Sequence, residues 1–295
     1  AAANAPLPLP LVHSAFQRAV GMSDVRIASA LLEAFDVRVQ AAQVSEGLVR
    51  AVCARGSVRL LEACLAAWDT DMNNIEKCYT AGFEVACRSG NCELVQRMLS
   101  APVGPRYLGT GPHLLDTQAG FEAVCEEGQL LILQALLEAS GTGAVDVHAR
   151  EAAGLLAAAR RGSLPLVQLL LSRRGPHEID MDRVGVGLVH AACAGGHVSV
   201  VEAVLRHSAL AVSASVAASA SSFLLVACAN GNAEVLDWLL RHGASMLSSI
   251  LAKAQDALIA ACEHGHTPVV KRLLSLTGER RIDVHAQNDE ALSGA

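Results

Sequence analysis

A glycine returns along this chain at an almost constant interval, and a period of about 20 to 50 residues is the mark of a repeat array. Counted from Ser23, successive intervals between equivalent positions are 33, 34, 38, 34, 34, 35 and 34 residues. Such a chain folds as a stack of similar units, each of which contacts its neighbours. The eight positions are Ser23, Gly56, Gly90, Gly128, Gly162, Gly196, Gly231 and Gly265.

Each of these positions is followed by a helical pattern of apolar residues. Leu, Ile or Val stands four residues after every one of them, and leucine stands nine residues after. Positions four, eight and nine share one face of an α-helix, so the pattern predicts a helix that buries this face. The leucines are Leu32, Leu65, Leu99, Leu137, Leu171, Leu205, Leu240 and Leu274.

A second pattern predicts another helix before each glycine. An apolar residue stands seven positions before the glycine, and a small Ala or Val stands four positions before it. Small residues let neighbouring repeats stack closely. The glycine is expected to end this helix in the left-handed conformation, which makes Ser23 the least favourable copy. We expect this first helix to be the shorter of the two.

The repeat resembles the ankyrin repeat. The pattern is clearest in residues 190–197, His-Ala-Ala-Cys-Ala-Gly-Gly-His, which are followed by apolar residues at 200, 201, 204 and 205. Residues 146–149 and 283–286, both Asp-Val-His-Ala, and residues 241–244, Arg-His-Gly-Ala, resemble the family's repeat end and its hairpin finger. The family's Thr-Pro opening of the first helix is absent from every copy, and several hairpins are replaced by irregular segments. The resemblance implies an all-α, ankyrin-type helical-repeat solenoid of about eight repeats.

The repeat pattern predicts the limits of the array. Residues 1–12 are expected to form an N-terminal extension, residues 13–278 the repeats, and residues 279–295 an incomplete C-terminal repeat. The widest glycine interval places an insertion at residues 100–118, where prolines alternate with glycines. We interpret it as a surface insertion; the alternative is a dedicated binding loop anchored by Tyr107.

The nine cysteines are predicted to be reduced. Six recur three residues before the glycine, and equivalent positions one repeat apart lie about 10 Å from each other, too far for a disulfide. Cys64, Cys78 and Cys92 follow no metal-ligand spacing. Reduced thiols indicate an intracellular protein, of the cytoplasm or, alternatively, of a mitochondrion or plastid. The six recurring core positions are Cys53, Cys87, Cys125, Cys193, Cys228 and Cys262.

The sequence contains no motif for catalysis, a metal or a cofactor. A Gly-rich phosphate loop and a nucleophile elbow are both absent. His264 and His266 form a His-x-His pair, which alone is a weak metal signal. The ankyrin pattern commonly has a structural histidine directly after the glycine, where His197 and His266 stand. We therefore expect no catalytic residue, no metal site and no cofactor.

Composition argues against nucleic acid and membrane partners. The net charge is −6 and the basic residues are scattered, so the chain lacks a surface that would attract nucleic acid. The most charge-free stretch, residues 207–233, is diluted by serines, which argues against a membrane span. The resemblance implies a non-enzymatic scaffold or protein–protein interaction module within a larger complex. The alternative is a specific inhibitor or regulatory subunit of one enzyme.

The resemblance also implies that the two variable residues before each glycine belong to the binding surface. These pairs are mixed in sign in the early repeats and largely neutral later, which fits a protein partner with alternating charge. Residues 208–222 carry no charge, and are either buried against a partner or a flexible connector. The predicted partner-binding residues are Arg55, Arg88, Glu126, Glu127, Arg160, Arg161, Asn230, His264, Val212 and Val216.

Overall fold

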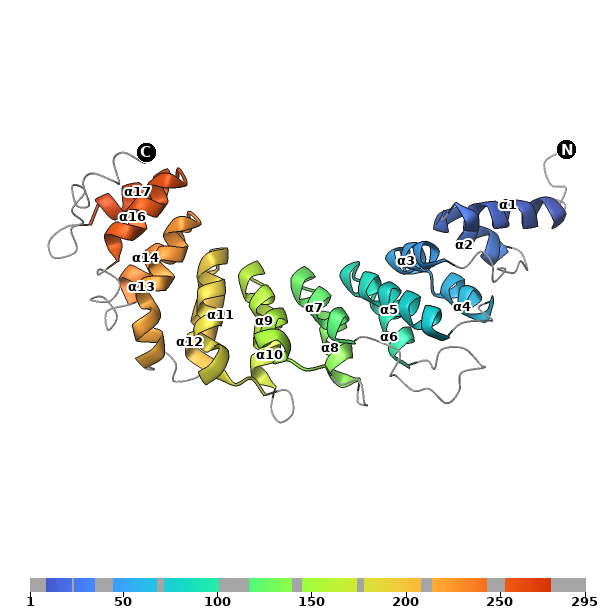
Figure 1. Ribbon diagram of the computed structural model, residues 1–295, viewed down its shortest axis with the longest axis horizontal. Coiled ribbons are helices and arrows are strands. Elements are labelled where there is room, and N and C mark those ends of the chain that lie inside the picture. The colour runs from blue at the N-terminus through green and yellow to red at the C-terminus, as the bar shows by residue number, and fades with distance from the viewer. Residues whose placement is uncertain are drawn as a thin grey trace. The chain divides into compact units, whose positions relative to one another are not determined.

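The computed structural model describes most of the chain as paired α-helices (Figure 1). The chain divides into two compact units, Ala1–Val145 and Asp146–Ala295. Each unit holds four of the eight helix pairs that the structure describes, which confirms the predicted all-α helical-repeat fold. The described residues are 9–22, 24–34, 45–67, 72–100, 117–139, 145–173, 178–207, 214–242 and 253–276.

The first unit is built in two layers. The first helices α3, α5 and α7 pack against one another, and the second helices α2, α4, α6 and α8 form the other layer. The eight helices are α1 (Leu9–Gly21), α2 (Val25–Ala34), α3 (Glu46–Arg55), α4 (Val58–Ala67), α5 (Met72–Arg88), α6 (Cys92–Ser100), α7 (Thr117–Glu127) and α8 (Leu130–Glu138).

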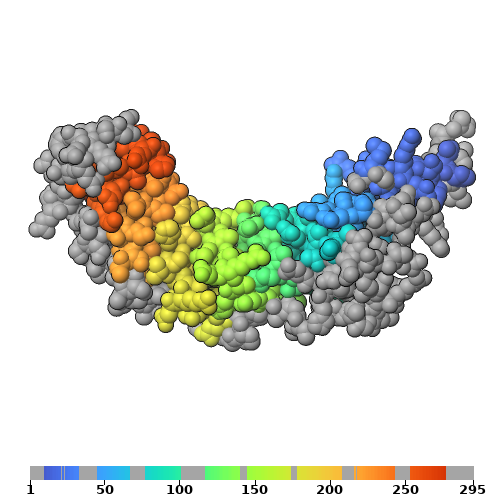
Figure 2. All heavy atoms as spheres, viewed as in Figure 1, coloured from blue at the N-terminus to red at the C-terminus, as the bar shows by residue number. Residues whose placement is uncertain are grey.

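The second unit repeats this arrangement. Its first helices α9, α11, α13 and α16 form one layer and its second helices α10, α12, α14 and α17 the other. The space between these ribbons is filled by side chains (Figure 2). The helices are α9 (Ala149–Arg161), α10 (Leu164–Ser172), α11 (Met181–Gly195), α12 (Val198–His207), α13 (Ala214–Ala229), α14 (Ala233–His242), α16 (Ala254–Glu263) and α17 (Thr267–Leu274).

Side-chain caps fix the start of two first helices, α3 and α11. The Ser45 hydroxyl accepts a hydrogen bond from the Leu48 backbone N–H, and the Asp180 carboxylate accepts from the N–H groups of Asp182 and Arg183. Both caps satisfy donors that the first turn of a helix leaves free. α9 instead begins with a left-handed turn at residues 150–152 before it becomes a regular helix.

The repeat glycines end the first helices as predicted. All seven adopt the left-handed conformation, with φ between 70° and 84°. Ser23, the one copy without glycine, lies outside the described residues. The predicted helix faces are also confirmed in the inner repeats, where the residue four positions after the glycine is at most 1% exposed. Ile27 in the first pair and Leu274 in the last are about half exposed, because each belongs to an outermost helix pair.

The expectation that the first helix is the shorter one is wrong. α5, α11 and α13 have 17, 15 and 16 residues, whereas the second helices that the structure describes have 8 to 10. The reason is that the chain before these helices continues in helical conformation where the family would form a hairpin. In α13 this extension is rich in alanine, the residue with the highest helix propensity.

Two sequence predictions concern residues that the structure describes only in part. α1 begins at Leu9, within the predicted extension 1–12, and Tyr107 with residues 101–116 of the predicted insertion lies outside the described residues. Residues 279–295, the predicted incomplete C-terminal repeat, are likewise entirely outside. The predicted limits of the array therefore remain predictions.

Candidate interaction surface

Successive repeats are joined at the residue that follows each glycine. The side-chain amide of Asn91 donates hydrogen bonds to the carbonyl oxygens of Cys53, at 2.7 Å, and Ala54, at 3.1 Å. Asn232 makes the same pair of bonds one repeat back in the second unit, at 2.8 and 2.9 Å. These carbonyls lie at the helix C-terminus, where backbone donors are few; the Cys53 carbonyl also accepts from the Gly56 N–H at 3.2 Å. The contact fixes the end of each first helix relative to the next.

Histidine serves the same purpose where it replaces asparagine. The Nε2 atom of His266 lies 2.9 Å from the carbonyl oxygen of Ala229, in the preceding repeat. The His197 ring packs directly on Gly162, so closely that a Cβ there would lie 2.4 Å from the His197 Nδ1 atom. The structural role predicted for these two histidines is confirmed.

The predicted variable pairs stand in the last turn of the first helices or directly after it. This placement makes them accessible: all of the predicted pair residues are exposed except Glu127, which is half-buried. Because the repeat junctions fix the helix ends, these side chains are presented from a rigid support. The exposed residues are Arg55, Arg88, Glu126, Arg160, Arg161, Asn230 and His264.

Three of the predicted residues meet in one ion-pair network in the first unit. Arg88 lies 3.1 Å from Glu126 and 3.9 Å from Glu127, both on the next first helix, and 3.2 Å from Glu84 on its own helix. Partial burial lowers the pKa of Arg88, but the hydrogen bonds and charges of Glu84 and Glu126 outweigh it and raise this pKa above its usual value. The charges of opposite sign that alternate in the sequence thus form ion pairs with one another on the surface.

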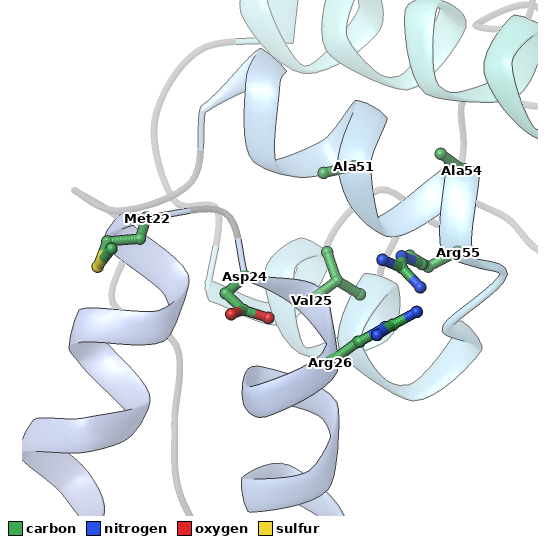
Figure 3. Close-up of a pocket in the computed structure, with 7 residues that line it drawn as sticks. All are labelled: Met22, Asp24, Val25, Arg26, Ala51, Ala54 and Arg55. Carbon is green, nitrogen blue, oxygen red and sulfur yellow. The ribbon is translucent and has the colours of Figure 1, made fainter.

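Arg55 lies in a different environment, beside a cavity of about 600 Å³. Figure 3 shows its guanidinium group and that of Arg26, from α2, facing the same space. Among the residues that the structure describes, neither guanidinium has an ion-pair or hydrogen-bond partner. Sequence reasoning missed Arg26, because it stands at the start of the second helix rather than in a variable pair. The residues that line the cavity are Met22, Asp24, Val25, Arg26, Ala51, Ala54 and Arg55.

In the second unit the predicted residues stand apart on successive repeats. The Asn230 amide donates to the carbonyl oxygen of Val226, in its own helix, at 2.8 Å. His264 lies 2.8 Å from the carbonyl oxygen of Ala260, and its ring stacks on His266 with centroids 6.0 Å apart. The structure describes these as separate exposed groups rather than as one cluster.

One variable pair is constrained by packing. A Cβ placed on Gly195 would lie 2.0 Å from the carbonyl oxygen of Arg160, in the preceding repeat. The glycine is therefore required for the close approach of the two repeats. Arg160 itself is exposed, and together with burial its charge lowers the pKa of His190. Arg160 is thus an exposed charged residue at this junction.

The second predicted surface requires a correction. Residues 214–222 belong to helix α13 and are not a flexible connector. Val216 is 1% exposed and shares a buried face with Ala220 and Phe223, one and two turns further on. Val216 is therefore a core residue rather than the accessible contact that was predicted. Val212 lies outside the described residues.

The opposite layer carries its own polar contacts between repeats, which sequence reasoning also missed. Arg97 lies 2.7 Å from Glu62 on the preceding second helix. In the second unit the Trp238 indole N–H donates to Glu202 at 2.9 Å, and Arg272 pairs with Asp237. In each case the acceptor stands six residues after its glycine and the donor seven residues after the next. This fixed offset is a signal that the sequence contains.

The cysteines are mostly core residues. Cys53, Cys87, Cys125, Cys193 and Cys228 are fully buried as predicted, whereas Cys262 is only partly so. Burial raises the pKa of Cys53, Cys87, Cys193 and Cys228 to about 12. None of the nine cysteines, all of which lie in the described part of the chain, forms a disulfide.

Two further classes of site were searched for in the described part of the chain. There, no three His, Cys, Asp or Glu side chains gather as a metal site would require. Among the helices described, none combines the length and the apolar character needed to cross a bilayer.

Comparison with known families agrees with this geometry. A family model of ankyrin repeats, in three copies, matches residues 155–250 and 224–293, which lie in the second unit. The first unit has the same paired helices and the same left-handed glycines. Residues 155–293 are ankyrin repeats, as the sequence pattern indicated. No curated protein matches the chain. Ankyrin repeats are protein–protein interaction modules, and this chain belongs to that class of protein.

Proposed function

We propose that this chain is a non-enzymatic scaffold that holds one or more other proteins within a larger assembly. The observation that carries the proposal is the series of exposed, non-identical residues at the ends of the first helices. In a repeat array these residues vary while the support is constant, so each repeat contributes a different contact to a partner. The series includes Arg55, Arg88, Glu126, Arg160, Arg161, Asn230 and His264, with the half-buried Glu127 beside Glu126.

The division into two units favours a scaffold over a single-partner module. Each unit has its own buried core and its own set of exposed first-helix ends. Each can therefore hold a partner by itself. Charges at the margin of such a surface set the orientation and the choice of partner more than the affinity.

The chemistry of the side chains supports a role in binding rather than catalysis. A cysteine nucleophile reacts as the thiolate, and burial raises the pKa of thiols such as Cys53 and Cys193 far above neutral pH. Nine free thiols also fit a reducing, intracellular compartment such as the cytoplasm. The scattered basic residues favour protein partners over nucleic acid.

Affinity purification of the full chain with cross-linking mass spectrometry tests the proposal. A scaffold gives cross-links from first-helix ends in both units to more than one protein. Arg160→Glu should weaken capture of the partner held by the second unit, whereas Arg59→Glu, an exposed and unpaired position on α4, should leave it unchanged. A single enzyme bound at one-to-one stoichiometry, with its activity altered by the chain, would instead establish the regulatory-subunit alternative.

A further inference from the structure

The cavity beside Arg55 has the features of a ligand site rather than of a gap between repeats. Its volume of about 600 Å³ is within the range of binding pockets, about 300 to 1,000 Å³. Two helices of adjacent pairs form it: Arg26 stands in the first turn of α2, and Arg55 is the last residue of α3. Figure 3 shows both guanidinium groups directed into one space.

What distinguishes this pair of arginines is that both stand at one cavity without an anion among the described residues. In the described part of the chain, Arg26 and Arg55 lack ion-pair partners. Five exposed arginines bind carboxylates of the chain itself, namely Arg50, Arg88, Arg97, Arg206 and Arg272. Arg59 is also unpaired among the described residues, but it does not line this cavity. Two like charges that face one space repel each other. An anion between them attracts both, and this attraction outweighs their mutual repulsion.

The one carboxylate that lines the cavity, that of Asp24, does not lie between the two guanidinium groups. Asp24 accepts a hydrogen bond from the Ile27 backbone N–H at 3.3 Å, which caps the start of α2. In Figure 3 it lies on the far side of Val25 from the two guanidinium groups. The cavity therefore keeps its positive end.

The remaining lining is small and apolar. Ala51 and Ala54 on α3 leave room beside the arginines, and Met22, which is 75% exposed, adds a flexible apolar surface. Guanidinium groups bind planar oxyanions with two parallel hydrogen bonds. The lining thus suits an oxyanion that is carried next to an apolar side chain, as on a peptide.

We propose that Arg26 and Arg55 form a subsite that binds an acidic segment of a partner protein, with its oxyanion between the two guanidinium groups and an apolar neighbour against Met22. The oxyanion is a Glu or Asp carboxylate or the phosphoryl group of a modified residue, since both have the same hydrogen-bonding chemistry. This inference rests on the proposed role in protein binding and assigns one of its contacts.

Fluorescence anisotropy with the full chain and defined peptides tests the subsite. The probe is a fluorescein-labelled peptide of alternating glutamate and leucine, compared with the same peptide carrying glutamine and with one carrying phosphoserine in place of glutamate. We expect the glutamine peptide to bind at least tenfold more weakly than the glutamate peptide. Stronger binding of the phosphoserine peptide, lost in the arginine variants, would assign the phosphoryl group as the natural oxyanion.

The variants separate the pocket from general attraction. The double variant Arg26→Gln/Arg55→Gln should lose at least tenfold in affinity for the glutamate peptide, whereas Arg59→Gln, also exposed and unpaired, should lose less than twofold. Unchanged helical circular dichroism verifies that the double variant folds. Equal binding of glutamate and glutamine peptides, or equal losses in both variants, overturns the subsite. If the full chain still captures proteins in that case, the scaffold proposal survives the failure of the subsite.

Discussion

The side-chain amide of Asn232 lies against Gly196 of the preceding repeat: a Cβ on that glycine would be 2.7 Å from the Asn232 Oδ1 atom. The same amide donates to the carbonyl oxygens of Cys193 and Ala194 at 2.8 and 2.9 Å. A left-handed glycine and the polar residue of the next repeat therefore form one joint. This joint holds the end of a first helix, where the proposed contacts stand.

Removal of the amide at this joint should destabilise the chain. Asn232→Ala removes two partly buried hydrogen bonds and takes the amide donor from the Ala194 carbonyl, whereas the Cys193 carbonyl keeps a bond from the Gly196 N–H at 3.3 Å. The free energy of unfolding should therefore fall by about 1 to 3 kcal/mol. Asn230→Ala, two residues away, removes an exposed amide that bonds only to its own helix and should cost less than about 0.5 kcal/mol. Urea denaturation followed by circular dichroism measures both. Equal costs would show that the amide does not join the repeats.

The glycine side of the joint gives a second prediction. Gly56→Ala combines left-handed strain, at φ 74°, with a Cβ 2.7 Å from the Asn91 side chain. Gly265→Ala has similar strain, at φ 70°, but meets no atom within 4 Å. The strain alone costs about 1 to 2 kcal/mol, so we expect Gly56→Ala to be the more destabilising of the two. The unfolding temperatures of the two variants test this expectation. If Gly265→Ala unfolds at the lower temperature, the contact with Asn91 does not add to the cost.

Burial of Val216 changes what its mutation can report. Val216→Asp places an unpaired charge in the core of α13 and should destabilise the second unit by about 3 to 5 kcal/mol. Ala218→Asp, exposed on the same helix, should cost less than about 1 kcal/mol. Denaturant unfolding of both variants measures this difference. If the Val216→Asp protein is as stable as the Ala218→Asp protein, Val216 is not buried and the assignment to the core is wrong.

Sequence reasoning recovered the features that the repeat period encodes directly. The glycine conformations and the buried helix faces follow from local spacing, because each repeat buries the same face in the same way. The start of α13 could also have been predicted, since Val216, Ala220 and Phe223 have the spacing of one helical face. It was missed because the alanine and serine content was interpreted as a connector.

The rest depends on contacts between repeats that no single period specifies. Arg26 and Arg55 belong to different positions of different repeats, and only the packing of α2 and α3 brings them to one cavity. The pairing of Arg88 with Glu126 was partly visible, because equivalent positions of adjacent repeats lie side by side. The division of the array after Val145 has no counterpart in the glycine spacing.

The buried thiols predict how stability depends on pH. In the folded chain burial raises the pKa of five thiols to about 12, from 9.0 for an unburied thiol. They are Cys53, Cys64, Cys87, Cys193 and Cys228. Folding therefore favours the protonated thiols, and this contribution is fully present below about pH 9. As the pH rises from 9 towards 12, the unfolded chain loses these protons and the folded chain does not, so the stability falls.

Urea denaturation at pH 7, 9 and 10.5 measures the effect. The midpoint should be highest at pH 7, lower at pH 9, where the thiols of the unfolded chain are about half ionised, and lower still at pH 10.5. Cys193→Ala should reduce the size of this shift, because it removes one of the groups that titrate only on unfolding. Ser199→Ala, which removes no thiol at an exposed position, should leave the shift unchanged. A midpoint that did not move between pH 7 and 10.5, or that moved equally in both variants, would show that the buried thiols ionise as readily in the folded chain as in the unfolded one.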